Sequence, residues 1–164
     1  MTDRHWLYAK YAADVYRFAL FLCGDATEAE EIAAETFARA LTGKAPLVSA
    51  TVKGYLLTIA RNLHLESLRR RKRLTKLPPE ITDPEPRPED IVSHRTELEA
   101  VTRYLQTFPE VDRAALLLRA DGVAYEEIAA ALRVSLASAK VKVHRLRAKL
   151  AQWRAGREGT ERSR

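Results

Sequence analysis

YEEIAAALRVSLASAKVKVHRLRAKL, the segment Tyr125–Leu150, contains two apolar patterns of helical period on either side of a short turn. The residues that these patterns place on an inner face are Ile128, Ala129, Leu132, Ala139, Val143 and Leu146. Ser135, at the turn, can accept an N–H bond from the first turn of the second helix. The small side chain of Ala129 lets the two helices cross closely. This spacing predicts a helix–turn–helix whose second helix presents its N-terminal half to the major groove of DNA.

The outer face of the second helix is basic. The side chains that we expect on it, and expect to contact DNA, are Ser138, Lys140, Val141, Lys142, His144 and Arg145. From Ile128 to Arg157 the chain has eight bases and no acid, which is typical of a surface that binds a polyanion. A plain helical hairpin is the alternative, and the absence of acids from the outer face argues against it.

A second amphipathic segment, YLLTIARNLHLESLRRRKR, spans Tyr55–Arg73. Its apolar side is formed by Tyr55, Leu56, Ile59, Leu63 and Leu68. The other side offers Arg61, Asn62 and an unbroken basic run from Arg69 to Arg73. An aromatic ring, an amide and guanidinium groups together can stack on unpaired bases and bond to them. By itself, the segment fits better with a helix whose long basic side chains only cover its apolar flank.

A third segment, GDATEAEEIAAETFARAL, spans Gly24–Leu41 and is acidic. Glu28, Glu31 and Glu35 fall on one helix face, and Asp25 and Glu28 favour the helix N-terminus electrostatically. By itself this pattern is most simply a solvated acidic face. In a chain that binds nucleic acid, such a face would repel DNA, so we expect it to contact a basic protein surface.

The chain reads as two small all-α domains joined by a proline-rich linker. Five of its seven prolines lie between residues 78 and 88, where they disfavour helix. We therefore expect a domain at 1–73, a linker at 74–93, a second domain at 94–153 and a polar tail at 154–164. The net charge is +4 over residues 1–73, −3 over 74–93 and +5 over 94–164. The expected helices cover roughly 6–22, 27–41, 52–73, 94–106, 110–120, 124–132 and 136–153. The first buries one face made of Trp6, Tyr11, Val15, Phe18 and Leu22.

Several classes of function are disfavoured. The 164 residues include a single cysteine, Cys23, so an intrachain disulfide is impossible and a reducing compartment fits best. The sequence predicts no signal peptide, no apolar stretch long enough for membrane insertion and no phosphate-binding loop. The four histidines lack metal-ligand spacing, and no serine lies in a nucleophile elbow. We therefore expect no catalytic residue, metal or cofactor, and we expect Cys23 to be a small buried apolar residue.

Taken together, the three segments resemble the extracytoplasmic-function (ECF) group of bacterial sigma factors, group 4 of the sigma-70 superfamily. AEEIAAETFARAL resembles region 2.2, which docks on the β′ clamp helices of RNA polymerase. YLLTIARNLHLESLRRRKR resembles regions 2.3 and 2.4, which melt the −10 element. The segment from Phe108 to Leu150 resembles region 4, which reads the −35 element. The resemblance implies a three-helix region 2-like domain and a region 4-like helix–turn–helix domain.

The resemblance also implies site residues and partners. The polymerase-binding residues would be Glu28, Glu31, Ala34 and Glu35. The −10 contacts would be Arg61, Asn62, Arg69, Arg70 and Arg71, and the six outer residues of the helix–turn–helix would contact the −35 element. The implied partners are core RNA polymerase (β′ clamp helices and β flap), promoter DNA and an anti-sigma factor, all in the cytoplasm, with the nucleoid as the site of the polymerase-bound form.

The chain departs from the family pattern at several positions. Ala34 stands where glutamine is usual, Tyr55 where tryptophan is usual, and Arg133 where glycine is common. The loop at 42–51 lacks the expected aromatic and glycine pattern, which leaves the −10 base preference open. Two other functions remain open as well. A DNA-binding regulator that acts without polymerase would leave the acidic helix unused, and a recombinase would need a nucleophile that the sequence does not show.

Overall fold

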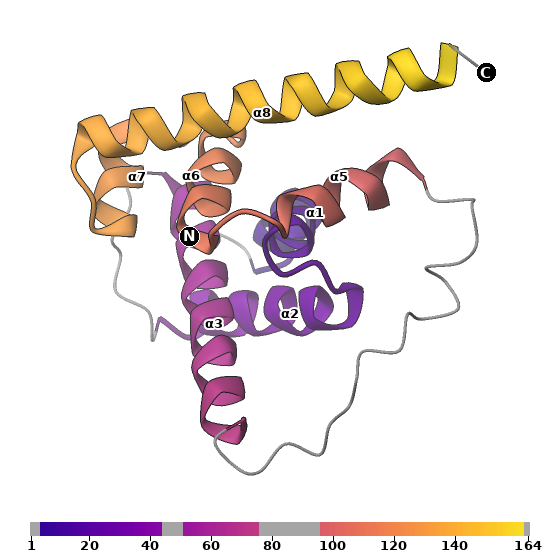
Figure 1. Cartoon of the computed structure of the whole chain (residues 1–164). Coiled ribbons are helices and arrows are strands. Elements are labelled where there is room, and N and C mark those ends of the chain that lie inside the picture. The colour runs from indigo at the N-terminus through magenta and orange to yellow at the C-terminus, as the bar shows by residue number, and fades with distance from the viewer. Residues whose placement is uncertain (1–3, 44–50, 76–95, 163–164) are drawn as a thin grey trace.

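The computed structural model describes residues 4–43, 51–75 and 96–162, and over these residues it is all-α (Figure 1). The helices are α1 (Arg4–Cys23), α2 (Ala26–Thr42), α3 (Val52–Leu74), α5 (Glu97–Leu105), α6 (Glu110–Ala120), α7 (Tyr125–Leu132) and α8 (Leu136–Arg162). The all-α expectation is confirmed. Most of the expected loop at 42–51 and of the linker at 74–93 lies outside the described residues. No described helix is long and apolar enough to cross a membrane.

The helix boundaries follow from local chemistry. Gly24, with φ of 77°, ends α1 in the left-handed region that glycine adopts without strain. The Asp25 carboxylate then accepts a bond of 2.9 Å from the backbone N–H of Glu28 and so caps α2. Thr51 caps α3 in the same way through the N–H of Gly54. These caps satisfy backbone donors that would otherwise lack partners, so the starts of α2 and α3 are encoded locally.

The buried face of α1 differs from the predicted one at its first turn. Val15, Phe18 and Leu22 are buried as expected, but Trp6 is 47% exposed and Leu7 is buried in its place. Leu7 lies eight residues before Val15, which keeps it on the same stripe of the helix, whereas Trp6 is rotated about 100° away from it. Trp6 instead meets the edge of the Tyr11 ring at the surface.

The two halves of the chain contact each other. The N-terminal half is α1–α3 and the C-terminal half is α5–α8, and α1 packs against α2 and α3 on one side and against α5 and α6 on the other (Figure 1). Buried apolar residues of both halves, among them Leu22 on α1 and Leu118 on α6, form one continuous cluster. The boundaries at 1–73 and 94–153 remain predictions. The sequence analysis did not foresee the contact between the halves.

The turn of the helix–turn–helix is built on a left-handed arginine. Arg133 has φ of 56° and ψ of 44°, and the N–H of Val134 reaches back to the carbonyl of Ala129 at 3.1 Å. Ser135 Oγ accepts from the N–H of Ser138 at 3.0 Å, which confirms the predicted cap of α8. The turn therefore closes as expected, with a residue at Arg133 that is strained in this conformation.

We expect Arg133→Gly to raise the free energy of unfolding by about 1 kcal/mol, because glycine adopts a positive φ without the Cβ clash. The measurement is urea unfolding of the full chain. Ala130→Gly, at an exposed position three residues earlier in α7, is the matched control, and it should lower stability by about 0.5–1 kcal/mol. Equal losses for both variants would show that Arg133 is not strained.

Candidate nucleic-acid and protein interfaces

The N-terminal part of α8 presents a basic surface. Ala139, Val143 and Leu146 are buried, as predicted, and hold α8 against the other helices of its half. On the outer side, four of the six candidate DNA-contacting side chains are exposed: Lys140, Val141, His144 and Arg145. Arg145 supplies a guanidinium group, Lys140 an ammonium group and Val141 an exposed apolar side chain. These are the types of group that read base edges in a major groove.

The other two candidates on α8 lie differently. Lys142 is half-buried, and its Nζ is 3.1 Å from Asp112 Oδ1 on α6. Ser138 is also half-buried, with its backbone N–H bonded to the cap residue Ser135. The expectation that both residues lie on the open face is therefore corrected, because one binds α8 to α6 and the other belongs to the first turn.

The candidate −10 residues on α3 fall into two groups. Asn62, Arg69, Arg70 and Arg71 are exposed, as the periodicity predicted. Arg61 is only 7% exposed. Its Nε and Nη2 donate to the two carboxylate oxygens of Glu110 at 2.8 and 2.9 Å. The expectation that Arg61 lies on the outer side of α3 is corrected, because that part of α3 is covered by the C-terminal half.

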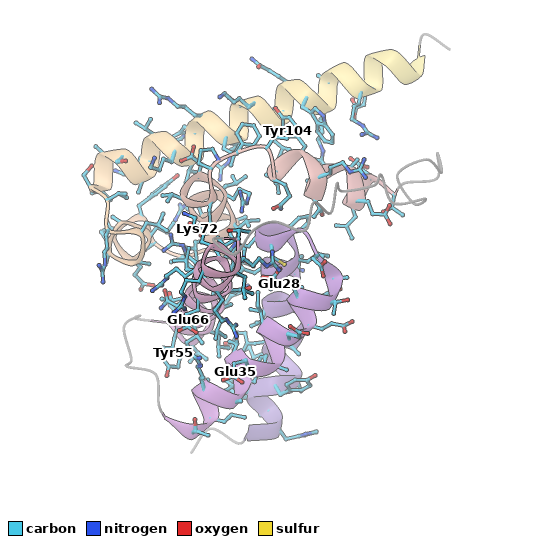
Figure 2. The ribbon with its side chains drawn as sticks, turned by 60° about the horizontal axis from the view of Figure 1, so that its bottom comes forward. Glu28, Glu35, Tyr55, Glu66, Lys72 and Tyr104 are labelled. Carbon is cyan, nitrogen blue, oxygen red and sulfur yellow. The ribbon has the colours of Figure 1, made fainter. Side chains whose placement is uncertain are left out.

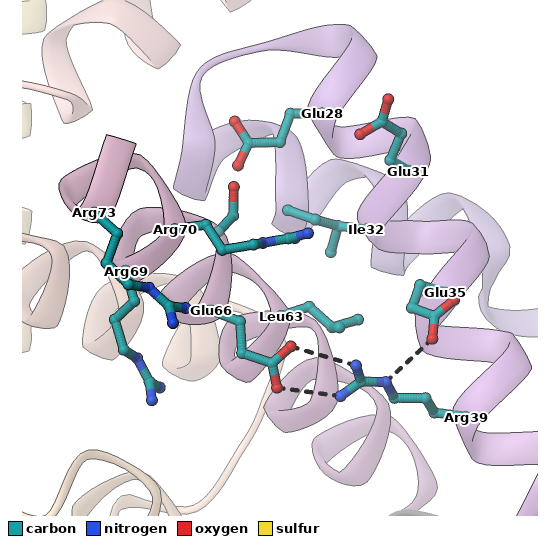
Figure 3. Close-up of a pocket in the computed structure, with 11 residues that line it drawn as sticks. Glu28, Glu31, Ile32, Glu35, Arg39, Leu63, Glu66, Arg69, Arg70 and Arg73 are labelled. Carbon is teal, nitrogen blue, oxygen red and sulfur yellow. Dashed lines mark hydrogen bonds and ion pairs between the residues drawn. The ribbon is translucent and has the colours of Figure 1, made fainter. Parts of the chain in front are cut away.

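The acidic residues of α2 and the basic residues of α3 line one hollow of about 630 Å³ (Figure 3). Glu28, Glu31 and Glu35 all border it, which agrees with their predicted shared face. Arg39 spans the hollow: its Nε is 3.2 Å from Glu35, and its two Nη atoms are each 3.3 Å from Glu66 on α3. Glu31 and Ala34 are exposed beside this network, so a basic partner can reach them.

Glu28 is the most buried of the three glutamates in the acidic stripe (Figure 2). It is 8% exposed, and its Oε2 accepts from Arg71 Nη2 at 2.7 Å. The expectation that Glu28 is open to a partner is corrected, because α3 covers it, and Arg71 is engaged with it. We therefore name Glu31, Ala34 and Glu35 the acidic face.

His64 is buried beside Glu28. It is 2% exposed, its ring nitrogens lack a hydrogen-bond partner, and Nδ1 is 3.6 Å from Glu28 Oε1. Burial lowers the pKa of His64 below its ordinary value, an effect that the charges of Glu28 and Glu110 partly offset and that of Arg113 reinforces. Protonation of the buried His64 ring is therefore less favourable in the folded chain than in the unfolded chain.

We expect stability to fall as the pH drops from about 7 to about 5, because the unfolded chain protonates His64 near its ordinary pKa of 6.5 while the folded chain resists protonation. The His64→Gln variant should lose stability less steeply over that range. The measured quantity is the midpoint of urea unfolding at several pH values, for the wild-type chain and for His64→Gln. His144→Gln, which replaces an exposed histidine on α8, should retain the wild-type slope. An unchanged slope in His64→Gln would contradict this assignment.

Cys23 is half-buried at the end of α1. Burial raises the pKa of its thiol to about 11, and Sγ donates to the carbonyl of Asp25 at 3.3 Å. The thiol is therefore protonated near neutral pH and is a poor nucleophile. Among the described residues, no group of histidine, cysteine and acidic side chains is arranged to hold a metal ion.

These surfaces together define a helical DNA-binding protein with a helix–turn–helix, a second basic helix and a separate acidic face. Residues 7–74 match the family model for Sigma-70 region 2, and residues 98–150 match the model for Sigma-70 region 4. The chain therefore belongs to the sigma-70 family of RNA polymerase sigma factors, within its ECF group.

Two relatives extend the comparison. The chain is 35% identical over 156 residues to the ECF RNA polymerase sigma factor SigE of Mycolicibacterium smegmatis. This match covers 91% of this chain and 60% of that protein. It is 29% identical over 157 residues to the ECF RNA polymerase sigma factor SigM of Bacillus subtilis. This second match covers 88% of this chain and 90% of the relative. The chain thus spans less than two thirds of the SigE relative and most of the SigM relative.

The fold is shared with a solved structure. The co-crystal structure of the sigma factor RpoE in complex with the anti-sigma factor NepR from Bartonella quintana matches with a TM-score of 0.68. The match covers 88% of this chain and 92% of that chain, at 21% identity. The likeness includes both helical halves, since the matched share exceeds either half alone.

Proposed function

We propose that this chain binds core RNA polymerase and directs it to specific promoters, where it helps to open the duplex. The observation that carries the proposal is the exposed acidic face of α2 beside the basic surface of α3, in a chain that also has a separate basic recognition helix. A regulator that only binds duplex DNA has no use for an acidic face. The family of the chain supports the same conclusion.

Within this function the surfaces have distinct roles. The acidic face (Glu31, Ala34 and Glu35) docks on the β′ clamp helices, and the C-terminal half contacts the β flap. Asn62, Arg69 and Arg70 hold the non-template strand of the −10 element, since an amide and guanidinium groups suit unpaired bases and phosphates. Lys140, Val141, His144 and Arg145 read the −35 element.

We further propose an anti-sigma factor as a protein partner. The likeness of the fold to a sigma factor solved with its anti-sigma factor supports this partner class. The chain would act in the cytoplasm, at the nucleoid when it is bound to polymerase. It carries out no chemistry of its own in this scheme, because polymerase supplies the catalytic centre.

The test is transcription in vitro with core RNA polymerase and genomic promoter fragments, with and without this protein. We expect defined transcripts only when the protein is present, together with permanganate-reactive thymines in the −10 region. Specific binding to duplex DNA with no effect on polymerase would instead identify a regulator that acts alone.

A further inference from the structure

The ion pair between Glu28 and Arg71 joins a buried acid to an exposed base. Glu28 lies in the first turn of α2, and Arg71 lies in the last turn of α3. Arg71 Nη2 donates to Glu28 Oε2 at 2.7 Å, and the side chains of Glu28 and Arg71 are 9% and 59% exposed. The carboxylate is therefore recessed, and a molecule that arrives from solvent meets the guanidinium first.

The second carboxylate oxygen of Glu28 is closed as well. Oε1 is buried without a hydrogen-bond partner, and it lies 3.6 Å from Nδ1 of the buried His64. A buried carboxylate needs a compensating cation, and Arg71 supplies one through a direct bond. Since Oε2 is bonded to Arg71 and Oε1 is buried, Glu28 offers neither oxygen to a basic partner protein, and its charge acts on α3.

The ion pairs of Arg39 on the same two helices have the opposite arrangement. Arg39 pairs with Glu35 and Glu66, and in both pairs the acid is more exposed than the arginine. Negative charge therefore lies on the open side of that network. In the Glu28–Arg71 pair the positive charge lies on the open side, which suits an anionic ligand.

Arg71 keeps donors for a second partner. A guanidinium has five N–H donors, and the bond to Glu28 engages only Nη2. Its neighbours Arg69 and Arg70 are exposed, and both line the hollow that Glu28 also borders (Figure 3). A long basic side chain normally loses rotamer freedom when it binds a ligand. The bond to Glu28 restricts the guanidinium in advance, so less freedom is lost when a phosphate binds.

We propose that Glu28 is a positioning residue for nucleic-acid binding, which holds the Arg71 guanidinium so that its remaining donors bond to a phosphate of the −10 element. The family pattern places Glu28 among the polymerase-binding residues, whereas its contacts connect it with the DNA-binding surface of α3. This inference rests on the proposed function for the identity of the DNA. The coupling between Glu28 and Arg71 is independent of that function.

The decisive variant is Glu28→Gln, which keeps the shape of the side chain and removes its charge. This change makes the chain more basic, so a purely electrostatic effect would tighten DNA binding, whereas a loss of positioning weakens it. We expect binding about threefold weaker than wild type. The salt dependence of the affinity should fall by up to about one unit, because a phosphate contact is weakened. A change that only destabilised the fold would leave that salt dependence unaltered.

Two further variants control for charge and for shape. Glu30→Gln makes the same charge change at an exposed position of α2, and it should bind DNA as tightly as wild type or slightly more tightly. Glu28→Asp keeps the charge but shortens the side chain by one methylene, and it should weaken binding about twofold. The measurement is the titration of core polymerase with bound chain against a promoter fragment whose −10 region is unpaired.

A double-mutant cycle decides whether Glu28 acts through Arg71. We expect Arg71→Ala to weaken DNA binding about fivefold, and we expect Glu28→Gln/Arg71→Ala to bind no more weakly than Arg71→Ala alone. Tighter binding by Glu28→Gln would show that Glu28 competes with DNA for Arg71. A loss that adds fully to that of Arg71→Ala would show that Glu28 acts elsewhere. Either result overturns the proposal.

The same cycle with the full chain alone uses a labelled oligo(dT) of about 16 nucleotides, which has phosphates but no promoter sequence. Where the wild-type chain directs polymerase to the promoter fragment, the cycle on that fragment decides. Where it does not, the proposed function fails and the cycle on oligo(dT) decides. Coupling between Glu28 and Arg71 on the deciding probe establishes the positioning role, and independent effects overturn it.

Discussion

The double replacement Glu31→Lys/Glu35→Lys should weaken binding to core RNA polymerase more than a hundredfold, or about 3 kcal/mol. Glu31 and Glu35 are both exposed on α2, so a basic partner can reach them. Reversing two charges in a complementary interface turns attraction into repulsion. Glu35 also holds Arg39, but Arg39 keeps its two bonds to Glu66, so the hollow between α2 and α3 should persist. The measurement is a fluorescence titration of labelled chain with core polymerase.

The control for this prediction is Glu30→Lys. Glu30 is exposed on the same helix but does not border the hollow. The variant Glu30→Lys makes a charge change of the same type away from the acidic face. It should alter the affinity for core polymerase by less than about 1 kcal/mol. Equal losses for Glu30→Lys and Glu31→Lys would mean that polymerase senses only the net charge of α2 and that the acidic face is not its docking surface.

The second large effect is expected at Arg145. Its side chain is exposed on the outer side of α8 and can offer two parallel bonds to one guanine. Arg145→Ala should lower the affinity of the holoenzyme for its promoter by about 1–3 kcal/mol and relax the preference at a single base pair of the −35 element. The measurement is binding to a panel of single-base promoter variants at several salt concentrations.

Lys149→Ala is the matched comparison for Arg145→Ala. Lys149 lies one turn further along α8, is exposed, and has its Nζ 5.5 Å from the centre of the Phe108 ring. We expect its loss to be neutral or to weaken all sequences alike, with a salt dependence lower by about one unit. An equal loss of affinity for all promoter variants with Arg145→Ala would show that Arg145 contacts the phosphate backbone and does not read a base.

Much of the helical architecture is encoded over short distances. The cap at Asp25, the cap at Ser135 and the buried stripe of Ala139, Val143 and Leu146 all depend on neighbours within one or two helical turns. Periodicity and capping are local properties, so they can be read from the sequence. The helix–turn–helix and the exposed outer face of α8 were predictable for this reason, and even the strained position at Arg133 was visible in advance as a departure from glycine.

The positions of Arg61, Glu28 and Lys142 were not predictable in the same way. Arg61 and Lys142 belong to polar faces by periodicity, yet each is covered by a helix from elsewhere in the chain and meets an acid there. Glu28 is covered by α3 in the same way. Which face of a helix a distant segment covers depends on contacts between residues tens of positions apart. Helical period therefore identifies the faces, and only tertiary packing decides which of two polar faces remains open to DNA or to polymerase.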